Sequence, residues 1–117
     1  MKRIALLPAF LLLILTLSGQ SPNGINYQTI VRDNNGIIIA DSALCLKLSI
    51  RADSINGFII YEETHDTITS SFGLVNLIIG QGTILSGCFD SIFWGETSHF
   101  LEISVDTNGD GSFDFLG

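Results

Sequence analysis

The fold is decided by the stretch Leu44-Cys45-Leu46-Lys47-Leu48-Ser49-Ile50-Arg51, in which apolar and polar residues alternate. In an extended strand, alternation of this kind places the three leucines and Ile50 on one face and the polar residues and Cys45 on the other. A strand with one apolar face has to bury that face against a second layer of structure. We therefore predict a β-strand over residues 44–51 in a layered fold.

Similar runs recur on both sides of this stretch. They are rich in β-branched and aromatic residues, and Asn-Gly or Asp-Gly pairs between several of them are typical of chain reversals. The segment 81–95 is the least regular part, and no helical period is evident. The fold class predicted is all-β, an immunoglobulin-like or transthyretin-like antiparallel β-sandwich of about seven strands. The further extended runs expected are 27–32, 37–39, 58–63, 64–69, 74–80, 100–106 and 113–115.

The first 19 residues have the layout of a secretory signal peptide. Lys2 and Arg3 precede an apolar run over 4–17, and small and polar residues follow from Ser18. The run is shorter than the about 20 residues of a membrane-spanning helix, although an uncleaved anchor is the alternative. We expect residues 1–19 to be removed and residues 20–117 to form one secreted or cell-surface domain, with no stable membrane span after cleavage.

The charge of the exported part is strongly acidic. Without the leader, Arg32, Lys47 and Arg51 stand against all twelve acids, and the net charge is 3 − 12 = −9. Nucleic-acid-binding surfaces need clustered Lys and Arg, and anionic membranes attract the same residues. The composition therefore argues against nucleic acid and against an anionic membrane surface as partners.

Two cysteines, Cys45 and Cys88, belong to the exported part. An extracellular setting permits a disulfide, and two cysteines allow one intramolecular pairing. Cys45, however, lies in the register that points away from the buried leucines. A Cys45–Cys88 bridge and two free thiols therefore both stay open.

The segment 106–114 has the spacing of a calcium-binding loop. Oxygen-bearing side chains occupy its first, third, fifth and ninth positions, and Gly111 is sixth. The twelfth position is Gly117, where such loops place a bidentate Glu, and an Asp/Asn/Gly-rich hairpin turn is the alternative reading. The sequence thus offers Ca²⁺ as its only candidate cofactor. The candidate ligands are Asp106, Asn108, Asp110 and Asp114.

No catalytic constellation is recognisable in the sequence, and we predict a non-enzymatic protein. His65 stands near Glu63 and Asp66, but adjacent strand residues point to opposite faces, and we interpret His65 and His99 as solvated surface histidines. The aromatic residues of segment 89–100 permit two readings, a platform for a ligand or an anchor that packs a long loop onto the core.

Five stretches in a fixed order carry a resemblance to a known family: GINYQTIVRDNNG at 24–36, YEETH at 61–65, FGLVNLIIGQG at 72–82, SIFWG at 91–95 and FLEISVD at 100–106. Together they resemble an amino-terminal domain of secreted surface proteins of Bacteroidota. That domain follows a signal peptide and precedes collagen-like repeats, tail-fibre-like segments or sorting domains. Segments 31–36 and 71–77 are also similar to transthyretin-like and carboxypeptidase regulatory-like sandwiches.

The resemblance implies a non-catalytic extracellular module for structure, assembly or display. Members usually continue with one more strand, so residues 20–117 are expected to lack the last strand and any following domain. Self-association through the incomplete sheet edge is then an expectation. The alternative is a small adhesion module that binds a protein or glycan at the cell surface, assisted by Ca²⁺.

Four Asp-Ser/Thr-aliphatic triplets resemble the sites that such bacteria O-glycosylate. All but the Thr67 triplet are expected in turns, where a glycan has room. The candidate acceptors are Ser42, Ser54, Thr67 and Ser91.

Overall fold

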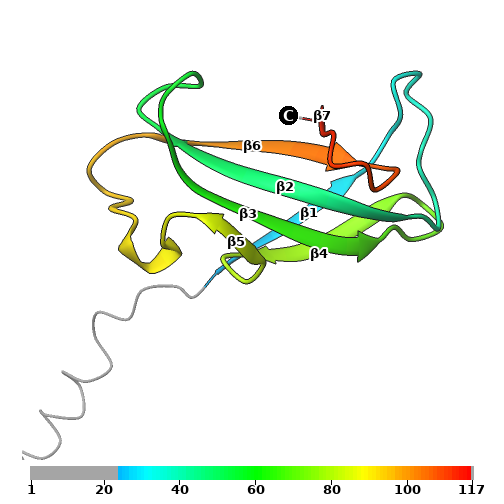
Figure 1. Cartoon of the computed structure of the whole chain (residues 1–117), viewed down its shortest axis with the longest axis horizontal. Helices are drawn as coiled ribbons and strands as arrows, with labels where there is room; N and C mark the ends of the chain where they lie inside the picture. The colour runs from blue at the N-terminus through cyan, green and yellow to red at the C-terminus, as the bar shows by residue number, and fades with distance from the viewer. Residues whose placement is uncertain (1–23, 117) are drawn as a thin grey trace, which may run out of the picture.

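A computed structural model describes residues 24–116, and the predicted signal peptide lies outside them. Every strand pair is antiparallel, so the predicted antiparallel β-sandwich of about seven strands is confirmed. The elements, labelled in Figure 1, are β1 (Ile25–Ile30), β2 (Ala43–Ala52), β3 (Ile59–Ile68), β4 (Leu74–Ile79), β5 (Thr83–Ser86), the 3₁₀ turn η1 (Phe89–Ser91), β6 (His99–Asp106) and β7 (Asp114–Phe115).

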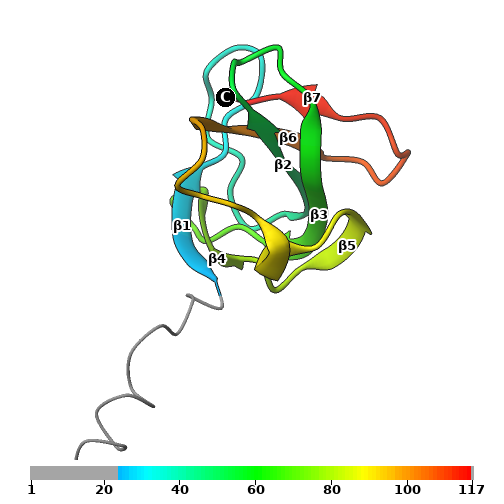
Figure 2. The same cartoon turned by 90° about the vertical axis from the view of Figure 1, so that its left-hand side faces the viewer.

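The strands form two sheets of unequal size. The larger sheet has the order β5-β3-β2-β6-β7, and the smaller sheet consists of β1 and β4. Viewed from the end, the small sheet lies as a second layer against the large one (Figure 2). The two layers bury each other's apolar faces, as the alternation in the sequence requires.

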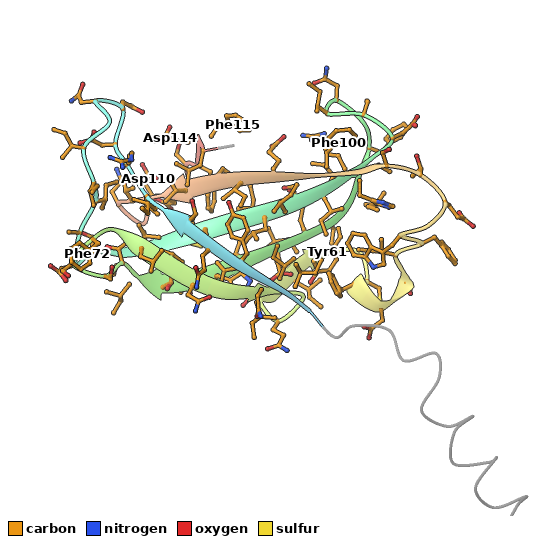
Figure 3. The ribbon with its side chains drawn as sticks, turned by 180° about the vertical axis from the view of Figure 1, so that it is seen from behind. Tyr61, Phe72, Phe100, Asp110, Asp114 and Phe115 are labelled. Atoms are coloured by element: carbon orange, nitrogen blue, oxygen red, sulfur yellow. The ribbon has the colours of Figure 1, made fainter. Side chains whose placement is uncertain are left out.

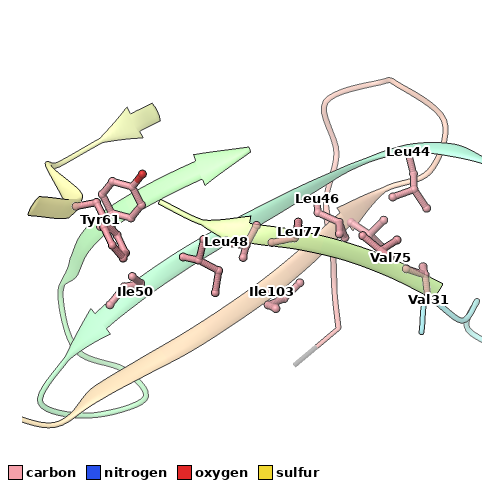
Figure 4. Close-up of a cluster of buried hydrophobic side chains, with 12 residues drawn as sticks. Val31, Leu44, Leu46, Leu48, Ile50, Tyr61, Val75, Leu77 and Ile103 are labelled. Carbon is pink, nitrogen blue, oxygen red and sulfur yellow. The ribbon is translucent and has the colours of Figure 1, made fainter. Parts of the chain in front are cut away.

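The core lies between the layers and is built on β2. The leucines of β2 and Ile50 are buried beside the inward side chains of β6 in the same sheet, and they face the buried side chains of β4 in the other layer (Figure 4). Burial of one such side chain contributes about 1.5–3 kcal/mol. The buried apolar residues are Val31, Leu44, Leu46, Leu48, Ile50, Tyr61, Val75, Leu77, Ile79, Phe89, Ile103 and Val105.

Some predicted boundaries were wrong. The runs 58–63 and 64–69 form the single strand β3, since no turn residue separates Glu63 from Thr64. Residues 37–39 form no strand but only a bridge between Arg32 and Ile38, because the Asp33 carboxylate accepts the amide of Ile37 and closes a tight turn. The segment 81–95 contains β5 and η1, which the sequence pattern did not reveal.

Candidate functional site

The carboxylate of Asp106 organises the loop that follows β6. Its Oδ1 accepts hydrogen bonds from the backbone amides of Asn108 (3.2 Å) and Gly109 (2.9 Å), and its Oδ2 accepts one from Gly111 (2.8 Å). Burial raises the pKa of this carboxyl, but the backbone amides together outweigh burial and hold the pKa below its usual value. Asp106 is therefore an ionised anchor for the loop.

Three of the four predicted calcium ligands come together. The side-chain amide of Asn108 lies 3.0 Å from a carboxylate oxygen of Asp106 and 3.0 Å from one of Asp110, and it donates to both when its NH₂ group faces them. Asp114 lies opposite Val105 on β7, and cross-strand partners share a face, so Asp114 and Asp106 point to opposite faces. Asp110 and Asp114 are at the same end of the sandwich (Figure 3).

Residues 24–116 contain no group of three or more His, Cys, Asp or Glu side chains that could hold a metal ion. A cation at this loop would therefore depend on the carbonyl oxygen of Asn108. Rotation of that amide by half a turn would replace its two donated hydrogen bonds with a third oxygen ligand.

We expect Asp106→Ala to lower the melting temperature by several degrees, because three backbone amides lose their acceptor. The folded-state pKa of Asp106 is lowered, so its stabilisation is present above the unfolded-state pKa and is lost as pH falls through the folded-state pKa. The difference between wild type and Asp106→Ala should therefore shrink below about pH 4. Asp110→Ala, which removes the acceptor of the Ser112 amide, is the control, and a difference that ignores pH would contradict this role.

A fully buried carboxylate on β3 was not anticipated from the sequence. Glu63 is 0% exposed, its Oε1 accepts the amide of Gly80 at 2.5 Å, and its Oε2 accepts the amide of Gly82 at 2.8 Å. The same Oε2 contacts Nε2 of His65, whose side chain is only 13% exposed. The interpretation of His65 as a solvated histidine was therefore wrong, because His65 lies on the inner face of β3 and contacts Glu63, which accepts the amides of the β4–β5 turn.

Tyr61 lies two residues before Glu63 on the same inner face. Its hydroxyl is buried, and no hydrogen-bond partner for it is present in the part of the chain that the structure describes. Burial, followed by the nearby Glu63 carboxylate, raises the pKa of Tyr61. The phenol is thus neutral and serves the core through its ring.

The aromatic residues near η1 form a packed series whose outer part reaches the surface, where Trp94 is 38% exposed and Phe93 is 70% exposed. Ring centroids are 5.5 Å apart between Tyr61 and Phe89, 5.6 Å between Phe89 and Trp94, and 5.0 Å between Trp94 and His99. Phe89 is buried, so this series anchors the segment between β5 and β6 on the core. Phe100 lies on the opposite face of the large sheet from Tyr61 (Figure 3).

The two cysteines are free thiols in the structure. Cys45 lies near the start of β2, opposite Asp106, whereas Cys88 lines a hollow with Ala52 at the end of β2. Seven residues of strand separate these ends by roughly 23 Å, far beyond the Cα separation of a disulfide. Of the two open alternatives, the structure contains the unpaired thiols.

Cys88 is the more acidic thiol. A hydrogen bond from Ser91 lowers the pKa of Cys88, whereas burial and then Asp66 raise the pKa of Cys45. His99 lines the same hollow as Cys88.

The predicted glycan acceptors differ in accessibility. Ser54 lies in an exposed turn and Ser91 is an exposed residue of η1. Ser42 is half-buried, and its hydroxyl donates to the carbonyl of Ala40 at 2.7 Å. Thr67 lies within β3, opposite the buried Leu44, and glycosylation of all four stays a prediction.

The small sheet is free of charge. Neither β1 nor β4 contains a charged residue, and their register runs without a bulge from Ile25↔Ile79 to Ile30↔Leu74. The inner face of β4 is buried. The outer face of the small sheet combines three partly exposed apolar residues, Ile30, Leu74 and Ile78 (46%, 39% and 39% exposed), with the uncharged amides Asn26, Gln28 and Asn76. This outer face is therefore uncharged and only partly apolar.

These features define a class, a small antiparallel β-sandwich with one uncharged, partly uncovered sheet. The chain belongs to the family described as Domain of unknown function (DUF8740), whose model matches residues 26–115, from β1 to β7. No curated protein and no solved structure matches the chain. Within residues 24–116, no helix has the length and apolarity needed to cross a membrane.

Proposed function

We propose that this chain is a non-catalytic extracellular module that serves assembly or display at the amino terminus of a secreted or cell-surface protein. The observation that carries the proposal is that the β1–β4 sheet contains no charged residue, although residues 20–117 have a net charge of −9. Interface cores are depleted in charged residues, because an ion that leaves water has to find a partner. An acidic domain with one uncharged sheet fits a role in packing against another chain.

The roles of the buried ionisable groups support a structural module. Glu63, in contact with His65, holds the β4–β5 turn, and Asp106 holds the loop between β6 and β7. The polar atoms of these side chains therefore bind backbone and side-chain groups of the same fold. The resemblance to surface proteins of Bacteroidota points to the same role.

The proposal is tested by expressing the chain with its own leader and a carboxyl-terminal epitope tag. We expect a product outside the cytoplasm whose amino terminus, read by mass spectrometry, follows Ser18 or Gly19. A Leu12→Arg variant, which interrupts the apolar run of the leader, is the control and should stay unprocessed. Wild-type chain that keeps its leader in the cytoplasm would contradict an extracellular role.

A second candidate function is calcium-assisted recognition of a protein or glycan at the cell surface. The observation that favours it is the convergence of Asp106, Asn108 and Asp110 in one loop. Their oxygen-bearing groups suit Ca²⁺, which binds carboxylate and amide oxygens.

If this loop binds Ca²⁺, millimolar calcium should raise the melting temperature of the wild type. A tenfold excess over the dissociation constant would add about 1.4 kcal/mol to the free energy of unfolding. Asn108→Ala should remove the calcium response, because it deletes the third oxygen ligand. An unchanged wild-type melt at millimolar calcium would exclude the site, and magnesium serves as the control ion.

A further inference from the structure

The free edge of β1 has none of the features that usually prevent sheet edges from pairing. Proteins blunt edges with short strands, charges, proline or bulges. β5 has four residues beside a register shift at Glu62/Glu63, and β7 has two residues, one of them Asp114. β1 has six uncharged residues, no proline and a continuous register.

The far edge of β4, in contrast, is capped by its own turns. The amide of Leu74 donates to Oγ of Ser70 at 3.1 Å, and the carbonyl of Leu74 accepts the amide of Ser70 at 3.0 Å. At the other end of β4, the carbonyl of Ile78 accepts the amide of Gln81 at 3.2 Å. The small sheet is therefore protected on the β4 side and open on the β1 side.

The hydrogen-bond pattern shows which residues of β1 face the open edge. The amide of Val31 donates to the carbonyl of Gly73 at 2.9 Å and continues the β1–β4 ladder, so residues of the same parity in β1 face β4. The backbone groups of Asn26, Gln28 and Ile30 therefore point away from β4. No hydrogen bond to these groups exists within the part of the chain that the structure describes.

We propose that β1 pairs antiparallel with β1 of a second copy of this chain, about a two-fold axis at Gln28. In this register Gln28 lies opposite the partner's Gln28, and Asn26 lies opposite the partner's Ile30. Each of these outward-facing residues then exchanges its backbone N–H and C=O with the other copy. The two small sheets become one four-stranded sheet. This inference rests on the proposed assembly role and names the partner.

A second copy is favoured over another occupant by self-complementarity. Residues 26, 28 and 30 share one face of β1, so a two-fold axis perpendicular to the sheet aligns equal faces and equal backbone groups. The strand brings no charge to the contact, and the like charges of two acidic copies stay on the large sheets and loops. A two-fold contact also closes on itself, so it gives a dimer and not a fibre.

Sedimentation equilibrium of the purified protein tests the edge. Gln28→Pro removes a backbone N–H that points to the open edge and leaves the N–H groups that bind β4. Edge strands tolerate proline at positions of this kind. We expect the wild type to dimerise and the Gln28→Pro variant to be monomeric. Salt should strengthen the association of the wild type, because salt screens the repulsion between two acidic copies. Asn76→Pro is the matched control: its amide points to the opposite edge, and dimerisation should persist.

Cysteine cross-linking tests the register in a Cys45→Ser, Cys88→Ser background. Directly opposed hydrogen-bonded residues have Cα atoms about 5.5 Å apart, within disulfide range. Gln28→Cys should therefore form a linked dimer on oxidation, whereas Asn26→Cys should link to Ile30→Cys in a mixture and not to itself.

A monomer at every concentration, or a dimer that survives Gln28→Pro, overturns the proposal, because the copies then do not associate or associate through another surface. These outcomes are separate from failure of the proposed function. An exported module that is monomeric still serves display, and a dimer that stays in the cytoplasm contradicts only the extracellular role.

Discussion

Replacement of Glu63 with alanine is expected to destabilise the fold by about 3 kcal/mol, since two half-buried backbone donors lose a fully buried acceptor at once. The amides of Gly80 and Gly82 both donate to this carboxylate, and Glu63 is 0% exposed. The β4–β5 turn would lose its attachment to β3, and His65 would lose its partner. Urea unfolding at neutral pH measures the change.

Two variants separate this network from a general effect of lost charge. Glu63→Gln keeps one carbonyl oxygen as an acceptor but turns an NH₂ group toward a backbone donor. We therefore expect its stability to lie between that of the wild type and that of Glu63→Ala. Glu96→Ala, at an exposed loop position, should change stability by less than about 0.5 kcal/mol. A Glu63→Ala protein as stable as Glu96→Ala would show that the buried carboxylate does not hold the turn.

Gly87→Ala is expected to cost about 3 kcal/mol, for two reasons that add. Gly87 has a φ of +81°, which strains any residue with a Cβ, and a Cβ there would overlap the carbonyl oxygen of Ile60 and lie 3.1 Å from Cα of Tyr61. The backbone of β3 cannot retreat, because β2 pairs with it on the other side. Thermal unfolding gives the change in stability.

Gly109→Ala is the matched comparison for that substitution. Gly109 has a similar φ of +74°, but no atom lies within 4 Å of its added Cβ, so only the backbone strain remains. We expect a loss of about 1 kcal/mol there. Equal losses at both positions would mean that the close approach of Gly87 to the backbone of β3 does not matter.

The sequence pattern predicted the features of the fold that depend on neighbouring residues, such as a strand and its buried face. The alternation from Leu44 to Ile50 gave the correct strand, the correct buried face and the outward position of Cys45. The sequence pattern did not predict β5, because all four of its residues are exposed and the strand has no amphipathic alternation.

The candidate site divides in the same way. Asp106, Asn108 and Asp110 meet because they lie within one loop, and spacing alone could indicate this. Glu63 contacts Gly80 and Gly82, which lie 17 and 19 positions further along the chain, because the two layers pack together. A periodic pattern in the sequence cannot predict such a contact. An acidic residue at an inward position of β3, between Tyr61 and His65, was the available signal.

The separation of the cysteines also depended on tertiary structure. The sequence placed Cys45 on the outer face but could not place Cys88, which belongs to the irregular segment before η1. Only the path of that segment, held by Phe89 and Trp94, puts the second thiol at the far end of β2.

Amide hydrogen exchange at Gln28 examines the pairing of β1 at the atom concerned. Thr29, whose amide faces β4, should be protected at every protein concentration and reports on the fold itself. If two copies join through this strand, protection of the Gln28 amide rises with concentration and disappears on dilution. A Gln28 amide that exchanges freely at all concentrations, beside a protected Thr29, would contradict the account.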